Sequence, residues 1–263
     1  MEENQIYEQI VESIRSSHPH LHETLHKAQS NRIDRLAVRA KGLRLDGLDE
    51  WLGYLKNLEA AFESEATLSQ VSFLIKRIRD DFETAIEASL SGLHSIVFDT
   101  MRDVMEIWML LQEFAHDPAR LPKWLGSSDQ ELANDFAPRE LRRRQAARLG
   151  VKREDLPETT DYRGHSRSLH VSPKSFPWER KGIVSKESDE FMTDMCYWEM
   201  FGHAKSIAIV VTNLAAALAP GKKIGWDVST ELPRVAKAYE AVMQMQSIFL
   251  ALLKAANETS AEA

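Results

Sequence analysis

The chain has 263 residues, of which 43% are hydrophobic and 28% are charged, and its net charge is −7. These values are typical of a globular protein with a sizeable core, and they exclude a disordered or fibrous chain. The single cysteine, Cys196, excludes an intrachain disulfide framework and a Cys-rich zinc site, and it favours a reducing, cytoplasmic location. The acidic N-terminus lacks a basic start followed by an apolar run, so no signal peptide is expected.

The spacing of apolar residues predicts helices along most of the chain. In chain order the predicted helices span residues 2–17, 19–40, 48–62, 67–91, 93–115, 138–149, 188–218 and 231–256. A turn is expected at residues 42–47, and Gly92, Pro118, Gly150 and Pro220 interrupt or end helices. In the first two helices the residues expected to face inward are Ile6, Ile10, Val11, Ile14, Leu21, Leu25, Ile33 and Leu36.

No segment alternates between apolar and polar residues for long enough to predict a sheet. The predicted fold class is therefore all-α, a single-domain bundle of about seven to nine helices over residues 1–263. Residues 151–187 show no sustained period and contain several prolines and glycines. We interpret residues 139–187 as a basic helix plus an irregular loop, inserted between core helices.

The most apolar stretch is residues 206–219, which is shorter than the ~20 residues that a membrane span requires. Glu199, His203 and Lys205 lie just before it, and ionisable side chains are costly next to lipid. The sequence therefore predicts a buried core helix and no membrane association.

Charge is distributed unevenly along the chain. Residues 139–186 hold 13 Lys and Arg against 6 Asp and Glu, a local charge of +7, and the rest of the chain carries −14. On the helix, Arg139, Arg142 and Arg143 can share one face, which predicts a compact cationic stripe. The loop adds further candidates for nucleic-acid binding, namely Arg163, Arg167, His170, Lys174 and Trp178.

Cations attract phosphates and aromatic rings stack on unpaired bases, so this segment fits single-stranded RNA or DNA. The alternative is that the basic segment docks on a partner, on a second copy, or on the acidic remainder of its own chain.

Several histidines have spacings seen in metal-binding bundles. His18, His22 and His26 recur at intervals of four, and Glu113 and Glu199 precede His116 and His203. However, His116 ends its helix, and the first three histidines lie away from the predicted buried stripe. We therefore expect solvated polar faces, with no metal ligands and no cofactor, and a metal-binding bundle is the third interpretation.

Two pairs of ionisable residues lie on apolar helices. Arg102 and Glu106 are one turn apart and can form an intrahelical ion pair. Glu199 and His203 are also one turn apart, so Glu199 could orient His203 as a general acid or base. Structural roles, as a pair at the helix edge and as a satisfied core histidine, are the alternatives.

Residues 100–125 (TMRDVMEIWMLLQEFAHDPARLPKWL) and 197–206 (YWEMFGHAKS) together resemble an uncharacterised bacterial family of HEPN-like helical proteins. The likeness lies in an arginine-then-glutamate helix, an Asp-Pro turn, a tryptophan, and the tyrosine-to-histidine start of a later helix. It covers about half of the chain. Many HEPN proteins are metal-independent RNases of defence or toxin–antitoxin systems that act as homodimers.

The resemblance implies a bundle with Arg102, Glu106 and His203 at its polar centre. It also implies a nucleic-acid-directed protein of a bacterial stress or phage-defence system, acting as an RNase in which His203 moves a proton and Arg102 stabilises phosphate charge. The chain departs from the RNase motif, which places arginine five to seven residues before the catalytic histidine, because Cys196, Tyr197 and Trp198 occupy those positions. Arg163 and His170 have the required spacing but lie in the loop.

Overall fold

The computed structural model describes residues 2–39, 43–159, 161–162, 165, 186–222, 224 and 232–244. Within these ranges every regular element is a helix, which confirms the predicted all-α bundle of about seven to nine helices. The elements up to residue 116 are α1 (Glu2–Ser13), α2 (Pro19–Arg39), α3 (Leu43–Ser64), η1 (Leu68–Val71), α4 (Ser72–Ser91) and α5 (His94–His116). They are followed by α6 (Arg120–Leu125), α7 (Asp129–Glu131), η2 (Leu132–Phe136), α8 (Pro138–Leu149), η3 (Arg153–Asp155), α11 (Lys186–Leu218) and a helix over residues 233–244.

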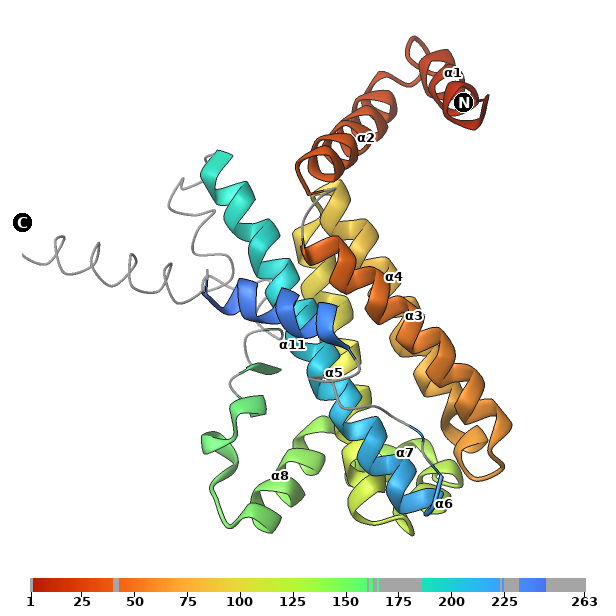
Figure 1. Ribbon diagram of the computed structural model, residues 1–263, viewed down its shortest axis with the longest axis vertical. Coiled ribbons are helices and arrows are strands. Elements are labelled where there is room, and N and C mark those ends of the chain that lie inside the picture. Colours follow the sequence, from red (N-terminus) through yellow and green to blue (C-terminus); the bar gives the residue numbers. More distant parts are fainter. Residues whose placement is uncertain are drawn as a thin grey trace, which may run out of the picture.

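The core of the bundle forms around α5, which packs between α4 and α11 (Figure 1). Helix α3 lies beside α4, where Trp51 packs edge-on against Phe82 at a ring separation of 5.3 Å. Arg44 of α3 forms an ion pair with Asp194 of α11 and lies over the Tyr197 ring. The helix over residues 233–244 crosses α11, and the Glu50 carboxylate accepts hydrogen bonds from the backbone N–H groups of Arg234 and Val235 at its first turn.

The predicted turn at residues 42–47 is wrong, because α3 begins at Leu43 and includes Gly47. A Cβ atom at Gly47 would lie 2.8 Å from the Cβ of Ala238 and 3.0 Å from the Phe201 ring. This glycine therefore permits a close approach of helices. By contrast, Gly92 (φ 82°) and Gly150 (φ 68°) adopt the left-handed conformation and end α4 and α8 as predicted.

The expectation that α1 and α2 bury a continuous apolar stripe is also wrong. Ile6, Ile10, Leu21, Ile33 and Leu36 are exposed, whereas Val11 is buried. The reason is tertiary, since α1 and α2 extend away from one end of the bundle (Figure 1). Helix α2 is attached at the end of α4, whose last carbonyl groups accept hydrogen bonds from its polar side chains: Asn31 donates to Ser91 and Arg35 to Leu90.

The last third of α11, from Ile207 to Leu218, is apolar on most sides, the pattern of a helix largely buried in protein. Residues 192–218 are long and apolar enough to span a bilayer, and an 18-residue window within them has a mean hydropathy of 1.4. Core helices also meet this criterion, and half of that window is buried. Cys196, Phe201, Ala204 and Val211 of this helix are fully buried. Two ionisable residues near its middle, Glu199 and His203, lie inside the bundle.

Candidate metal centre

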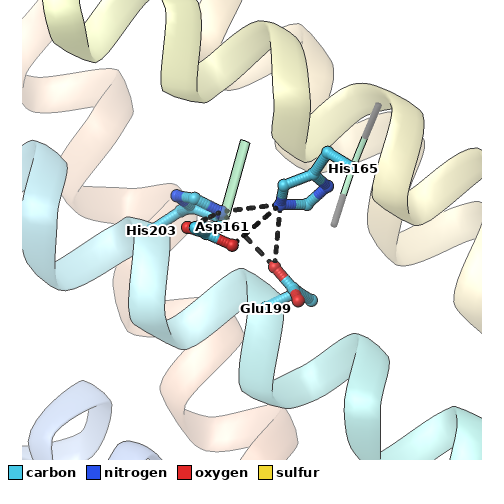
Figure 2. Close-up of side chains that lie close together, drawn as sticks. All are labelled: Asp161, His165, Glu199 and His203. Carbon is cyan, nitrogen blue, oxygen red and sulfur yellow. Dashed lines mark hydrogen bonds and ion pairs between the residues drawn. The ribbon is translucent and has the colours of Figure 1, made fainter. Parts of the chain in front are cut away.

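Helix α11 brings Glu199 and His203 to the same face, one turn apart. Their exposed fractions are 7% and 8%, so two ionisable side chains lie inside an apolar bundle. Such groups must be paired to be tolerated there. They are paired with Asp161 and His165, from the segment that follows α8 (Figure 2).

The four side chains point toward a common centre, as Figure 2 shows. The Nε2 atom of His165 lies 3.4 Å from Asp161 Oδ1, 3.2 Å from Glu199 Oε2 and 3.4 Å from His203 Nε2. The Nε2 atom of His203 lies 3.4 Å from Glu199 Oε2 and 3.9 Å from Asp161 Oδ2. One donor atom from each residue falls within 4.8 Å of all the others.

These separations fit a single metal ion. In a tetrahedral site with metal–ligand distances of about 2.0–2.1 Å, neighbouring ligand atoms are roughly 3.3–3.4 Å apart. Four of the five distances given above lie within about 0.2 Å of that range. The longest involves Asp161, whose two distances end on different carboxylate oxygens and whose side chain is 35% exposed, so this residue would have to shift to complete the site. Two imidazoles and two carboxylates are a donor set for zinc, iron or manganese.

A hydrogen bond on the side of the ring away from the cluster fixes the orientation of His165. Its Nδ1 atom lies 2.9 Å from the backbone carbonyl oxygen of Phe98 on α5, and a carbonyl only accepts, so Nδ1 carries a proton and donates it. In the neutral ring this leaves the lone pair on Nε2, facing the other three residues. Metal-binding histidines characteristically have such a partner behind the ring. The His165 side chain is only 2% exposed, so the ring is also enclosed.

In the absence of a metal ion, the pKa values of His165 and Glu199 are strongly shifted. Burial by itself would lower the pKa of His165, but its hydrogen bonds with Asp161 and Glu199 and their charges outweigh burial and raise that pKa to about 10. Burial would raise the pKa of Glu199, but its contacts with His165 and His203 outweigh it and lower that pKa to about 2. The metal-free cluster therefore contains a buried ion pair, in which a proton occupies a position that a metal ion could take.

A cavity of about 490 Å³ adjoins the cluster, between α5, α11 and residues 157–161. Its apolar wall comprises Met105, Trp108, Pro157 and Trp198, and its polar wall comprises Glu158, Asp161, His203 and Ser206. Asp161 and His203 belong to both the cluster and the cavity. A metal ion held by the cluster would therefore border a space of the size that small ligands occupy.

The predicted ion pair between Arg102 and Glu106 on α5 forms, and it lies beside the four-residue cluster. Arg102 Nε lies 3.2 Å from Glu106 Oε1, which confirms the intrahelical ion pair. Arg102 also donates to the hydroxyl of Tyr162 at 2.8 Å, and that hydroxyl donates to Glu106 Oε1 at 3.0 Å. Arg102 thus contacts Tyr162, the residue next to Asp161. Asp161 in turn lies 3.9 Å from His203.

The predicted stripe of three arginines on α8 does not form as one exposed surface. Arg139 and Arg143 are exposed, but Arg142 is 8% exposed, with its guanidinium 4.1 Å from the centre of the Tyr162 ring. Its Nε donates to the carbonyl of Pro138. Packing against the Tyr162 segment thus turns one member of the stripe inward. The other predicted nucleic-acid contacts, Arg163, Arg167, His170, Lys174 and Trp178, lie outside the described residues.

Two further arginines of α8 bind an acid of the same chain. Arg144 Nε lies 2.7 Å from Glu113 Oε1, and Arg148 Nη1 lies 2.7 Å from Glu113 Oε2. Arg120 reaches the same carboxylate at 3.1 Å. Glu113 is 2% exposed, and the three contacts join α5, α6 and α8. Part of the basic segment is therefore engaged within the protein.

Sequence reasoning identified Glu199 and His203 but not Asp161 and His165. A signal was present, because Asp161 precedes His165 by four residues, the same spacing as in Glu199 and His203. The sequence around residue 161 lacks helical periodicity, so this repetition predicted no shared face. In the structure residues 157–159, 161–162 and 165 are helical, and the predicted irregular loop is wrong there. The N-terminal histidines, which attracted attention as ligands, are placed elsewhere; His22 stacks on His26 and contacts Glu12 of α1.

No family model, curated protein or solved structure matches this chain.

Proposed function

We propose that this protein binds one divalent transition-metal ion through Asp161, His165, Glu199 and His203. The observation that carries the proposal is the convergence of four donor atoms, at separations that suit a tetrahedral site, from two segments far apart in sequence. The hydrogen bond from His165 Nδ1 to the Phe98 carbonyl supports it, because it directs the Nε2 lone pair to the centre. The donor set favours zinc, iron or manganese over calcium or magnesium.

The site has the features of a catalytic centre. Structural metal sites are closed, whereas catalytic sites keep a position for water or substrate. Asp161 is the most exposed of the four side chains and lies farthest from His203, so it is the ligand that water would displace. The cavity reaches the site through Asp161 and His203. The reaction class that fits is metal-assisted hydrolysis, in which the metal lowers the pKa of a bound water and polarises the substrate.

Metal analysis tests this proposal. The purified protein, and the chelated protein after dialysis against zinc, manganese or iron(II), should each hold about one equivalent. His203→Ala and Asp161→Asn should reduce binding, whereas His116→Ala, at the exposed end of α5, serves as a matched histidine control. Circular dichroism establishes that each variant is folded. If the wild-type protein binds none of the three metals at micromolar concentrations, the proposal fails.

The second candidate is the HEPN-like, nucleic-acid-directed function, with RNase activity in a homodimer that serves a bacterial stress or defence system. Arg102, at the edge of the same site through Tyr162, and the exposed Arg139 and Arg143 favour it. In this proposal His203 moves the proton and Arg102 stabilises phosphate charge, without a metal.

The two candidates differ in their dependence on metal. Cleavage of single-stranded RNA that persists in excess chelator and is lost in Arg102→Ala would support the RNase and count against a metal mechanism. RNA binding should also fall steeply with salt if phosphates are contacted. Absence of binding at low salt removes this candidate. It would leave the interaction-protein alternative, which the internal contacts of Arg144 and Arg148 favour.

A further inference from the structure

The cavity beside the metal centre has one carboxylate that no protein group fully satisfies. Glu158 Oε1 accepts a hydrogen bond from Gln145 Nε2 at 3.2 Å, but Oε2 is buried and has no hydrogen-bond partner among the described residues. A buried acceptor without a partner is costly, and more so when it carries charge. Glu158 also lines the cavity, so a rotation of its carboxyl group would present this acceptor to a donor on a bound ligand.

The cavity wall also contains two aromatic side chains. Trp108 and Trp198 both line the cavity and are only half-buried. The indole N–H of Trp198 donates to Met243 Sδ at 3.1 Å, so this ring has no polar group left for a ligand and offers its carbon surface. Tryptophan faces attract ammonium and guanidinium groups, and the attraction strengthens when water is excluded.

The charge of the cavity also favours a cationic ligand. Among the residues that line the cavity, Glu158 is the acidic residue outside the metal cluster. Gln145, its hydrogen-bond partner, is neutral, and the other cavity-lining residues away from the metal cluster carry no charge. The cavity is thus an acidic space with aromatic walls, and its volume of about 490 Å³ suits a small molecule.

We propose that this cavity binds a small organic cation, an alkylamine or guanidine compound, with its charged end at Glu158 and its remainder extending toward the metal centre. The ammonium or guanidinium would donate to the Glu158 carboxylate and pack against the tryptophans. As a substrate assignment the inference rests on the proposed metal function; as a binding site it does not. The same chemistry occurs on a lysine side chain, and the test includes that source.

Titration calorimetry on the full chain tests the inference. The probes are agmatine, n-butylamine and Nα-acetyl-lysine methylamide, with n-butanol as a neutral molecule of similar shape. Each is titrated into the metal-loaded and the chelated protein. We expect agmatine or n-butylamine to bind at least about tenfold more tightly than n-butanol, in line with the energies of a charged hydrogen bond and a cation–π contact. Preference for the lysine derivative would identify a peptide as the source of the cation, within the same chemistry.

Two matched variants locate the site. Glu158→Gln keeps the shape and removes the charge, and it should weaken amine binding about tenfold or more while leaving n-butanol unchanged. Glu83→Gln, at an exposed position of α4, should leave all binding unchanged. Trp108→Leu should weaken amine binding several-fold.

The outcomes separate the two proposals. Amine binding in a protein that binds no metal supports the cavity assignment and removes its substrate role. Metal binding without amine binding overturns the inference and leaves the metal centre standing. Equal binding of n-butanol and n-butylamine, or binding that Glu158→Gln does not change, overturns it as well.

Discussion

The Nδ1 atom of His165 and the carbonyl oxygen of Phe98 are 2.9 Å apart, although the two residues are separated by 67 positions in the sequence. This contact commits the Nδ1 proton to the backbone of α5 and turns Nε2 toward Asp161, Glu199 and His203. The Phe98 carbonyl, which lies outside the cluster, thereby determines which ring nitrogen of His165 faces the other three residues. The same arrangement serves a metal ligand in the neutral ring and an ion-paired imidazolium in the protonated ring.

Metal binding should stabilise the fold. A ligand that binds only the native state, present at about 100 times its dissociation constant, adds about 2.7 kcal/mol. For a chain of this size that corresponds to a rise in Tm of about 5–10 °C. Differential scanning calorimetry with zinc or manganese should show the rise in wild type and in His116→Ala, but not in His203→Ala. An equal rise in all three proteins would place the bound metal elsewhere.

In the metal-free protein the cluster should stabilise most strongly between about pH 4.5 and pH 6.5. The pKa of Glu199 is lowered from 4.5 to about 2, so its contribution is complete above pH 4.5 and is lost as the pH falls toward 2. The pKa of His165 is raised from 6.5 to about 10, so its contribution is complete below pH 6.5 and is lost as the pH rises toward 10.

The measurement is the free energy of unfolding against pH, in chelator, for wild type and His165→Gln. Their difference should be largest within that window and should shrink on both sides. A difference that stays constant from pH 4 to pH 10 would contradict the charged pair.

Replacing Glu113 should destabilise the protein substantially. Glu113→Gln leaves Arg120, Arg144 and Arg148 around a neutral group, although their side chains keep exposed fractions of 18–24% and so some hydration. Breaking a fully buried ion pair costs about 3–5 kcal/mol, so we expect about 2–3 kcal/mol here. Urea unfolding measures the loss. Glu140→Gln, which removes an exposed pair with Arg143, is the control and should not change the midpoint measurably.

Asp81 should make the protein less stable as the pH rises. Burial and the neighbouring carboxylate of Asp103 raise its pKa from 3.8 to about 8, against the opposing charge of Arg77. An acid whose pKa is raised by folding binds its proton more tightly in the folded state, so stability falls between about pH 4 and pH 8. Asp81→Asn should therefore be more stable than wild type at pH 8 and closer to it at pH 4. A larger advantage at pH 4 would reverse the assigned sign.

Two glycines of α3 should respond in opposite directions to the same substitution. Gly47→Ala would place a Cβ 2.8 Å from that of Ala238, so the 233–244 helix must shift, at a cost of about 1–3 kcal/mol. Gly53 is exposed and a Cβ there meets nothing within 4 Å, so Gly53→Ala should stabilise by about 0.4–1 kcal/mol. Thermal unfolding of both variants provides the comparison, and a neutral Gly47→Ala would show that the helices are not in close contact.

The local structure of this protein follows from short-range features of its sequence. Helical periodicity, Pro138 at the start of α8, and Gly92 and Gly150 at helix ends act over a few residues, so the all-α fold and most helix bounds followed from them. The ion pair between Arg102 and Glu106 followed for the same reason, because helix geometry alone places residues four apart together.

Which of those surfaces meet depends on the tertiary structure. Gly47 has the composition of a turn residue, yet it lies inside α3, where Phe201 and Ala238 approach too closely for a Cβ atom. The apolar residues of α1 and α2 have the correct spacing to be buried, yet they stay exposed because no described helix covers them. Asp161 and His165 join Glu199 and His203 across 38 residues because the chain that follows α8 runs back to α5 and α11. Short-range spacing identifies a pair of ligands on one helix, but the second pair depends on long-range packing, which local sequence does not encode.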